Sequence, residues 1–124
     1  MPAQILIVDD SSLIRNLVRL HFEAQPGWQV CGEAANGEEG IQKAQALSPD
    51  LVVLDLSMPV LNGLEAARIL NQRMPNIGVI MFTSFMTPYL ESEALAAGVH
   101  RVISKSGPLS ELIECARSLL SRAA

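Results

Sequence analysis

Residues 51–59 read Leu51-Val52-Val53-Leu54-Asp55-Leu56-Ser57-Met58-Pro59, in which an unbroken apolar run ends on a carboxylate. Four apolar residues without polar alternation are typical of a strand covered on both faces, as in a parallel sheet. Burying an unpaired charge costs several kcal/mol or more. Asp55 is therefore expected at a surface, in an ion pair, or in a chemical role.

The rest of the chain alternates similar strands with amphipathic helices. Short β-prone runs bounded by turn residues predict strands at 4–8, 28–33, 51–54, 77–82 and 99–103. A helix is predicted after each strand, at about 13–22, 38–47, 64–73, 88–97 and 109–120. Five strand–helix units predict an α/β, doubly wound (βα)5 domain with a five-stranded parallel sheet and right-handed crossovers. They are too few for an eightfold barrel.

Length and composition narrow the class of protein. The 124 residues fit one domain, expected to span 1–124, and 49% hydrophobic with 18% charged residues indicates a compact globular chain. A net charge of -4 without a basic run argues against direct nucleic-acid binding by this segment. No apolar run approaches the ~20 residues of a membrane span. The N-terminus lacks a signal-peptide pattern, so a cytoplasmic location is expected, with Cys31 and Cys115 as unpaired thiols.

Polar residues collect where the predicted strands end. Since the carboxyl ends of parallel strands share one edge of the sheet, residues that follow different strands are expected to meet there. They are Asp9-Asp10, Asp55, Thr83-Ser84 and Ser104-Lys105. Taken singly, Asp10 could cap the first helix and Lys105 could be an ordinary surface charge. Their coincidence at one edge favours a site.

The charge of this edge predicts a cation. Two carboxylates about 4 Å apart repel by roughly 4 kcal/mol at an effective dielectric near 20. Lys105 balances part of the charge of three acids, and a divalent cation would balance the rest. With oxygen ligands and no nearby His or Cys, Mg²⁺ fits better than zinc. An aspartate beside such an ion can accept a phosphoryl group as an acyl phosphate.

These residues together resemble a known family over essentially the whole chain. Its signature here comprises Asp9-Asp10, Asp55, Met58-Pro59, Asn62-Gly63, Thr83 and Lys105, and it is similar to the receiver domain of two-component response regulators. The resemblance implies the flavodoxin-like sheet order 2-1-3-4-5. It also implies that Asp55 is the phosphoacceptor, supplied by a sensor histidine kinase or a phosphotransfer protein.

The resemblance also assigns the other site residues. Mg²⁺ would be held by Asp10, Asp55 and the backbone oxygen of Ser57, and through water by Asp9. Thr83 and Lys105 would contact the phosphoryl group. The domain would catalyse its own phosphorylation and slow dephosphorylation, as a signalling switch rather than a conventional enzyme.

The output surface is expected in the C-terminal part of the chain. The family uses the fourth helix, fifth strand and fifth helix as its output face, often for phosphorylation-dependent homodimers. The stretch 32–39 with Ser104-Lys105-Ser106 looks most like receivers attached to helix-turn-helix DNA-binding domains, which implies transcription control through another domain. Val102 stands where many receivers have Tyr or Phe, so the route to the output surface is expected to differ.

Two alternatives remain open at this point. An aspartyl-phosphate hydrolase would share the strand-end Asp and Mg²⁺, but it usually needs a second Asp at the position that Ser57 occupies. A receiver-like interaction module would not take phosphate, but it would be expected to have lost an acid or the lysine. Outside the cluster, Phe85 is expected to slow hydrolysis by restricting water, and His21 to be partly buried on the first helix.

Overall fold

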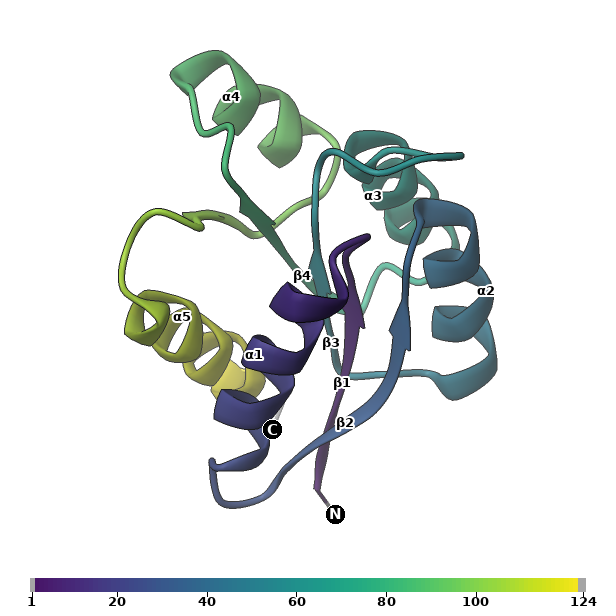
Figure 1. Cartoon of the computed structure of the whole chain (residues 1–124). Coiled ribbons are helices and arrows are strands. Elements are labelled where there is room, and N and C mark those ends of the chain that lie inside the picture. Colours follow the sequence, from purple (N-terminus) through teal and green to yellow (C-terminus); the bar gives the residue numbers. More distant parts are fainter. Residues whose placement is uncertain (1, 123–124) are drawn as a thin grey trace.

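A computed structural model describes residues 2–122 and contains five parallel strands in the order β2-β1-β3-β4-β5 (Figure 1). The fold class and sheet order predicted above are confirmed. The elements are β1 (Ala3–Val8), α1 (Ser12–Glu23), β2 (Trp28–Ala34), α2 (Gly37–Leu47), β3 (Leu51–Leu54), α3 (Gly63–Arg73), β4 (Gly78–Thr83), α4 (Pro88–Ala96), β5 (Arg101–Ser104) and α5 (Leu109–Arg122). Among residues 2–122, no helix combines the length and the hydropathy that a bilayer crossing needs.

The sheet is buried on both faces, as the apolar run before Asp55 predicts. Alternate residues of β1 face opposite ways: Ile5 and Ile7 pack in one core with α1 and α5, whereas Leu6 and Val8 pack in a second core with α2, α3 and α4. All four residues of β3 are buried. A central strand without a solvent face leaves room for polar residues only beyond its end.

Four helices begin at a side-chain cap. The side chains of Ser11, Asn36, Asn62 and Thr87 each accept a hydrogen bond from the backbone N–H three residues on. The cap of α1 is therefore Ser11 and not Asp10. Asp10 is left exposed at the sheet edge, free for another role.

The boundaries and the burial of two segments differ from the prediction. The fifth strand begins at Arg101 rather than residue 99, because the turn that ends α4 continues through Gly98 at φ +100 and Val99 N–H donates to the carbonyl of Ala94. On α1 only Val18 and Phe22 are buried. His21 is exposed, so its predicted partial burial was wrong; its ring lies against its own helix, with Nδ1 3.0 Å from the carbonyl oxygen of Leu17.

Candidate functional site

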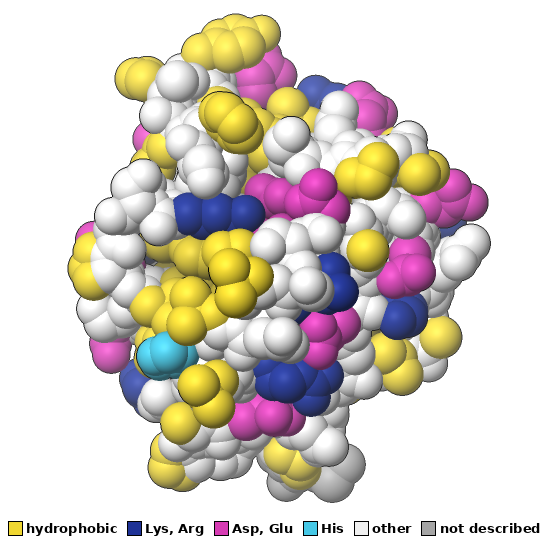
Figure 2. Space-filling view, in the orientation of Figure 1, with side chains coloured by type: hydrophobic (Ala, Val, Ile, Leu, Met, Phe, Trp, Pro, Cys, Tyr) yellow, Lys and Arg dark blue, Asp and Glu magenta, His cyan; other side chains and the backbone are white. Residues whose placement is uncertain are grey.

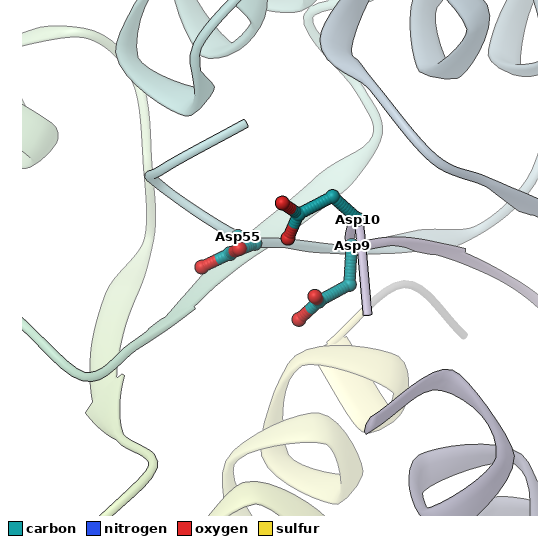
Figure 3. Close-up of side chains that lie close together, drawn as sticks. All are labelled: Asp9, Asp10 and Asp55. Atoms are coloured by element: carbon teal, nitrogen blue, oxygen red, sulfur yellow. The ribbon is translucent and has the colours of Figure 1, made fainter. Parts of the chain in front are cut away.

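Three carboxylates meet at the carboxyl edge of the sheet (Figure 3). Asp9 and Asp10 follow β1, and Asp55 follows β3, the neighbouring strand. One carboxylate oxygen of each lies within 4.8 Å of the others. Asp9 and Asp55 are 2% and 6% exposed, whereas Asp10 is exposed. The three acids therefore meet in the folded chain, as the sequence predicted.

Lys105 lies between two of these acids. Its Nζ is 2.8 Å from Oδ2 of Asp9 and 3.2 Å from Oδ1 of Asp55. Its backbone N–H also donates to the carbonyl of Thr83 at 2.8 Å, which fixes the end of β5 against β4. The surface-charge alternative for Lys105 is therefore wrong: the ammonium group is a half-buried internal counterion.

Thr83 ends β4 beside Asp55. Leu54 is paired with Met81 in the parallel ladder, so Thr83 leaves its strand one residue beyond the level of Asp55. Thr83 is fully buried, and its Oγ1 accepts a hydrogen bond from the N–H of Phe85 at 3.0 Å. The hydroxyl proton remains available for an acceptor at the site. Phe85 itself is 62% exposed.

Burial and neighbouring charges shift the pKa values of Asp55 and Lys105. Burial raises the pKa of Asp55, and the neighbouring Asp9 raises it further, against the opposing effects of Lys105 and of the Leu56 N–H. Burial would lower the pKa of Lys105, but its contacts with Asp9 and Asp55 outweigh this and raise it. One ammonium group thus compensates the charge of the pocket only in part.

The donor set fits a hard divalent cation. The acids offer carboxylate oxygens only, and one lysine leaves the three of them with excess negative charge. Ser57 lies two residues beyond Asp55 in the loop between β3 and α3, and it is exposed. Its backbone oxygen as a ligand stays a prediction.

Gly63 packs against the backbone of Asp55 and Leu56, a role that the sequence did not predict. Its N–H donates to the carbonyl of Leu56 at 2.8 Å. A Cβ at this position would lie 2.2 Å from the carbonyl oxygen of Asp55. Only glycine lets the start of α3 approach this backbone so closely. The signal available was Asn62-Gly63, which reads equally well as an ordinary turn.

The fold and the edge residues define an α/β domain of the doubly wound class whose acidic pocket lies at the carboxyl end of its central strands. Residues 5–117 match the family model described as the response regulator receiver domain. The chain belongs to this family. This membership argues against the alternative of an aspartyl-phosphate hydrolase.

Known relatives agree with this assignment. The chain is 35% identical over 117 residues to the response regulator protein VraR of Staphylococcus saprophyticus, covering 94% of this chain and 56% of that protein. The chain thus spans little more than half the length of that relative. A two-component response regulator of the LuxR family from Aurantimonas sp. SI85-9A1 superposes with a TM-score of 0.93 at 30% identity, over 98% of this chain and 86% of that one.

A third relative was solved with ligands. A chain of the CheX-CheY-BeF3-Mg+2 complex from Borrelia burgdorferi has a TM-score of 0.91 at 26% identity, over 97% of this chain and 90% of that chain.

Proposed function

We propose that this receiver takes a phosphoryl group onto Asp55 from a phosphohistidine of a sensor histidine kinase or a phosphotransfer protein. The observation that carries the proposal is the position of Lys105, whose Nζ lies 3.2 Å from a buried Asp55 oxygen at the edge where the other acids meet. A carboxylate with a lysine beside it can take up a phosphoryl group while the ammonium group stabilises the charge on the phosphoryl oxygens.

The pocket supplies ligands for Mg²⁺ from oxygen atoms alone. Asp10, Asp55 and the Ser57 backbone oxygen would hold the ion directly, and Asp9 through water. When bound, the ion neutralises the charge on the phosphoryl oxygens. The magnesium named in the complex of the Borrelia relative supports this assignment.

The chain's own groups then divide the remaining work. A carboxylate oxygen of Asp55 attacks phosphorus while the phosphorus–nitrogen bond to the donor histidine breaks; the imidazole leaves with a proton and an acyl phosphate remains. Lys105 pairs with one phosphoryl oxygen, and the Thr83 hydroxyl donates to another. In the slow hydrolysis of this acyl phosphate, water attacks phosphorus, the phosphorus–oxygen bond to Asp55 breaks, and the Asp55 carboxylate and inorganic phosphate are released.

The partners and the output follow from the same proposal. Hydrophobic side chains gather over α1 and beside α5 (Figure 2), and Leu13, Leu17 and Leu20 are exposed there. A kinase or phosphotransfer protein would dock near this surface, next to the acid edge.

Phosphorylation would shift the α4–β5–α5 face, with homodimerisation as one result. The domain would span 1–124, act in the cytoplasm, bind no nucleic acid itself, and control transcription through a further domain.

Intact mass spectrometry tests the proposal. The protein is incubated with MgCl₂ and a small phosphoryl donor, acetyl phosphate or phosphoramidate, with Asp55→Asn as the control. We expect one added phosphoryl group on the wild type, dependent on Mg²⁺, and none on the variant. A wild type without an adduct, or an equal adduct on Asp55→Asn, would overturn the proposal.

A further inference from the structure

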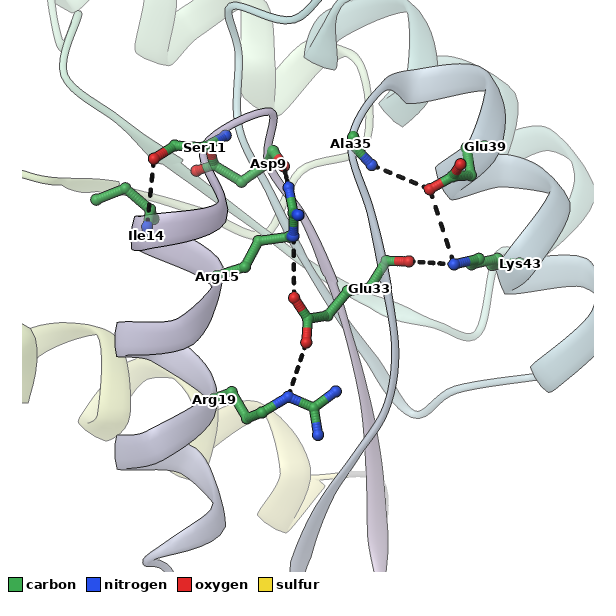
Figure 4. Close-up of polar contacts among 9 residues, drawn as sticks. All are labelled: Asp9, Ser11, Ile14, Arg15, Arg19, Glu33, Ala35, Glu39 and Lys43. Atoms are coloured by element: carbon green, nitrogen blue, oxygen red, sulfur yellow. Dashed lines mark hydrogen bonds and ion pairs between the residues drawn. The ribbon is translucent and has the colours of Figure 1, made fainter.

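Two arginines of α1 share one carboxylate of β2, but only one of them reaches the acid edge (Figure 4). Arg15 Nε lies 2.9 Å from Oε1 of Glu33, and Arg19 Nε lies 2.7 Å from Oε2. Arg15 in addition donates from Nη1 to the main-chain carbonyl of Asp9 at 2.6 Å. The two side chains therefore form a matched pair on Glu33, from which each makes one further contact: Arg15 with the Asp9 carbonyl, and Arg19 with the exposed Glu23, whose Oε2 lies 3.6 Å from its Nη1.

The contact to the Asp9 carbonyl lies where β1 passes into the acidic turn. Because a peptide unit is planar, the carbonyl oxygen of Asp9 fixes the plane that also carries the nitrogen and Cα of Asp10. The other polar groups of Asp9 are already held: its N–H donates to Ala34, and its carboxylate accepts from the Ser11 N–H and from Lys105. Arg15 supplies the remaining contact, at the point where the chain turns toward Asp10.

Glu33 holds the Arg15 side chain in place and offsets the charge of its guanidinium group. Burial would raise the pKa of Glu33, but Arg19 and Arg15 outweigh this and lower it, so the carboxylate is ionised beside them. The Arg15 side chain is 19% exposed and that of Glu33 25%. A paired guanidinium group repels a nearby cation less than an unpaired one, so the hydrogen bond is left as the main effect of Arg15 on the site.

We infer that Arg15 is a positioning residue for the magnesium site, acting through the Asp9–Asp10 peptide. The inference rests on the proposed function, because it assumes that Asp10 binds the ion. Arg15 does not touch the ion or the phosphoryl group. It holds the main chain so that the exposed Asp10 carboxylate faces Asp55 before the ion arrives. Groups that orient metal ligands in this way typically contribute 10–100-fold to affinity.

Calorimetric titration of the whole chain with MgCl₂ tests the inference. Arg15→Gln removes both the ion pair and the carbonyl contact, whereas Arg19→Gln removes an ion pair to the same Glu33 and leaves the carbonyl contact in place. We expect the dissociation constant for Mg²⁺ to rise about tenfold in Arg15→Gln and to stay within about twofold of wild type in Arg19→Gln. Arg15→Lys, which keeps a donor, should recover part of the loss.

A second measurement separates positioning from a general loss of structure. In phosphorylation by phosphoramidate, Arg15→Gln should raise the Mg²⁺ concentration for half-maximal rate and leave the rate at saturating Mg²⁺ close to wild type. Melting temperatures without Mg²⁺ should fall similarly in Arg15→Gln and Arg19→Gln, because each loses its ion pair with Glu33 and one further contact, that of Arg15 with the Asp9 carbonyl or that of Arg19 with Glu23.

The outcomes that overturn the inference are distinct. Equal loss of affinity in both variants would show that only the Glu33 network matters, and tighter binding by Arg15→Gln would show that charge repulsion dominates. Unchanged affinity in Arg15→Gln, while Asp10→Asn loses binding, would refute positioning alone. A wild type that binds no Mg²⁺ would refute the proposed metal site and the inference with it.

Discussion

Gly63→Ala is the substitution that tests most directly how the fold supports Asp55. The added Cβ would lie 2.2 Å from the Asp55 carbonyl oxygen, 2.8 Å from Cα of Leu56 and 3.0 Å from the Asp55 carbonyl carbon. All three atoms are backbone, so no side chain can rotate away. Ordinary contact begins near 3.4 Å, so the end of β3 or the start of α3 has to move. The required shift is about 1 Å, a displacement that can lower a reaction rate about 100-fold.

The sign of the stability change in Gly63→Ala shows whether the close contact with the Asp55 backbone dominates. Gly63 is not among the residues with positive φ, so without the close contact alanine would stabilise the helix start by about 0.4–1 kcal/mol. Overpacking costs about 1–3 kcal/mol instead, so we expect a net loss. Urea denaturation measures the free energy of unfolding, and phosphoramidate with Mg²⁺ measures the phosphorylation rate.

Gly107→Ala is the matched control for this experiment. It lies two residues after Lys105, and its Cβ would approach only the Glu111 side chain, at 3.4 Å. We expect wild-type phosphorylation and equal or slightly higher stability. If Gly63→Ala also gained stability and kept the wild-type rate, the claim that this glycine fixes the backbone of Asp55 would be refuted.

Three further perturbations test other parts of the site. Asp55→Asn should raise the free energy of unfolding without Mg²⁺ at about pH 7: a raised carboxylate pKa means that ionisation destabilises the fold, so the gain should shrink as the pH falls toward the ordinary value of 3.8, and a gain that grew in acid would contradict the assignment. Phe85→Asn should shorten the half-life of the phosphorylated protein, followed by intact mass after donor removal, if the aromatic ring restricts water; an unchanged half-life would refute this role. Val60→Asn should stabilise by about 0.5–1 kcal/mol in urea denaturation, because Val60 has φ 69 and a side chain that is 74% exposed; lower stability would show that its remaining packing outweighs the strain.

The sequence predicted the strand-end residues because they depend on topology alone. Once strands and helices alternate, Asp9, Asp55 and Lys105 have to lie at one edge, and hydrophobic periodicity is enough to establish that alternation. The roles of Arg15 and Gly63 were not predicted because they depend on where a side chain or a backbone atom lies in the folded chain. Arg15 reaches Glu33 across 18 positions of sequence, and no local pattern reports such a pairing.

The apolar pattern of α1 predicts more buried residues than the structure contains. Leu13 and Leu17 follow the helical spacing of buried residues, yet they are 76% and 43% exposed. Periodicity predicts which face of a helix is apolar, but the width of the buried stripe depends on how closely the neighbouring helix packs. Apolar residues beyond that width are available for contacts with other molecules.

Val102 lies in the core that β5 shares with α4. It is 5% exposed, pairs with Met81 across the β4–β5 ladder, and lies in the same buried core as Leu90 and Ala94 of α4. A swinging aromatic ring would move between solvent and the interior, but a buried valine has no such second position. Lys105 and Thr83, joined through the N–H and carbonyl at the ends of β5 and β4, are the nearest groups that phosphorylation would pull. Because packed interiors transmit strain and do not deform continuously, the output under the proposed function has to come from a shift of β5 and α4 as packed units.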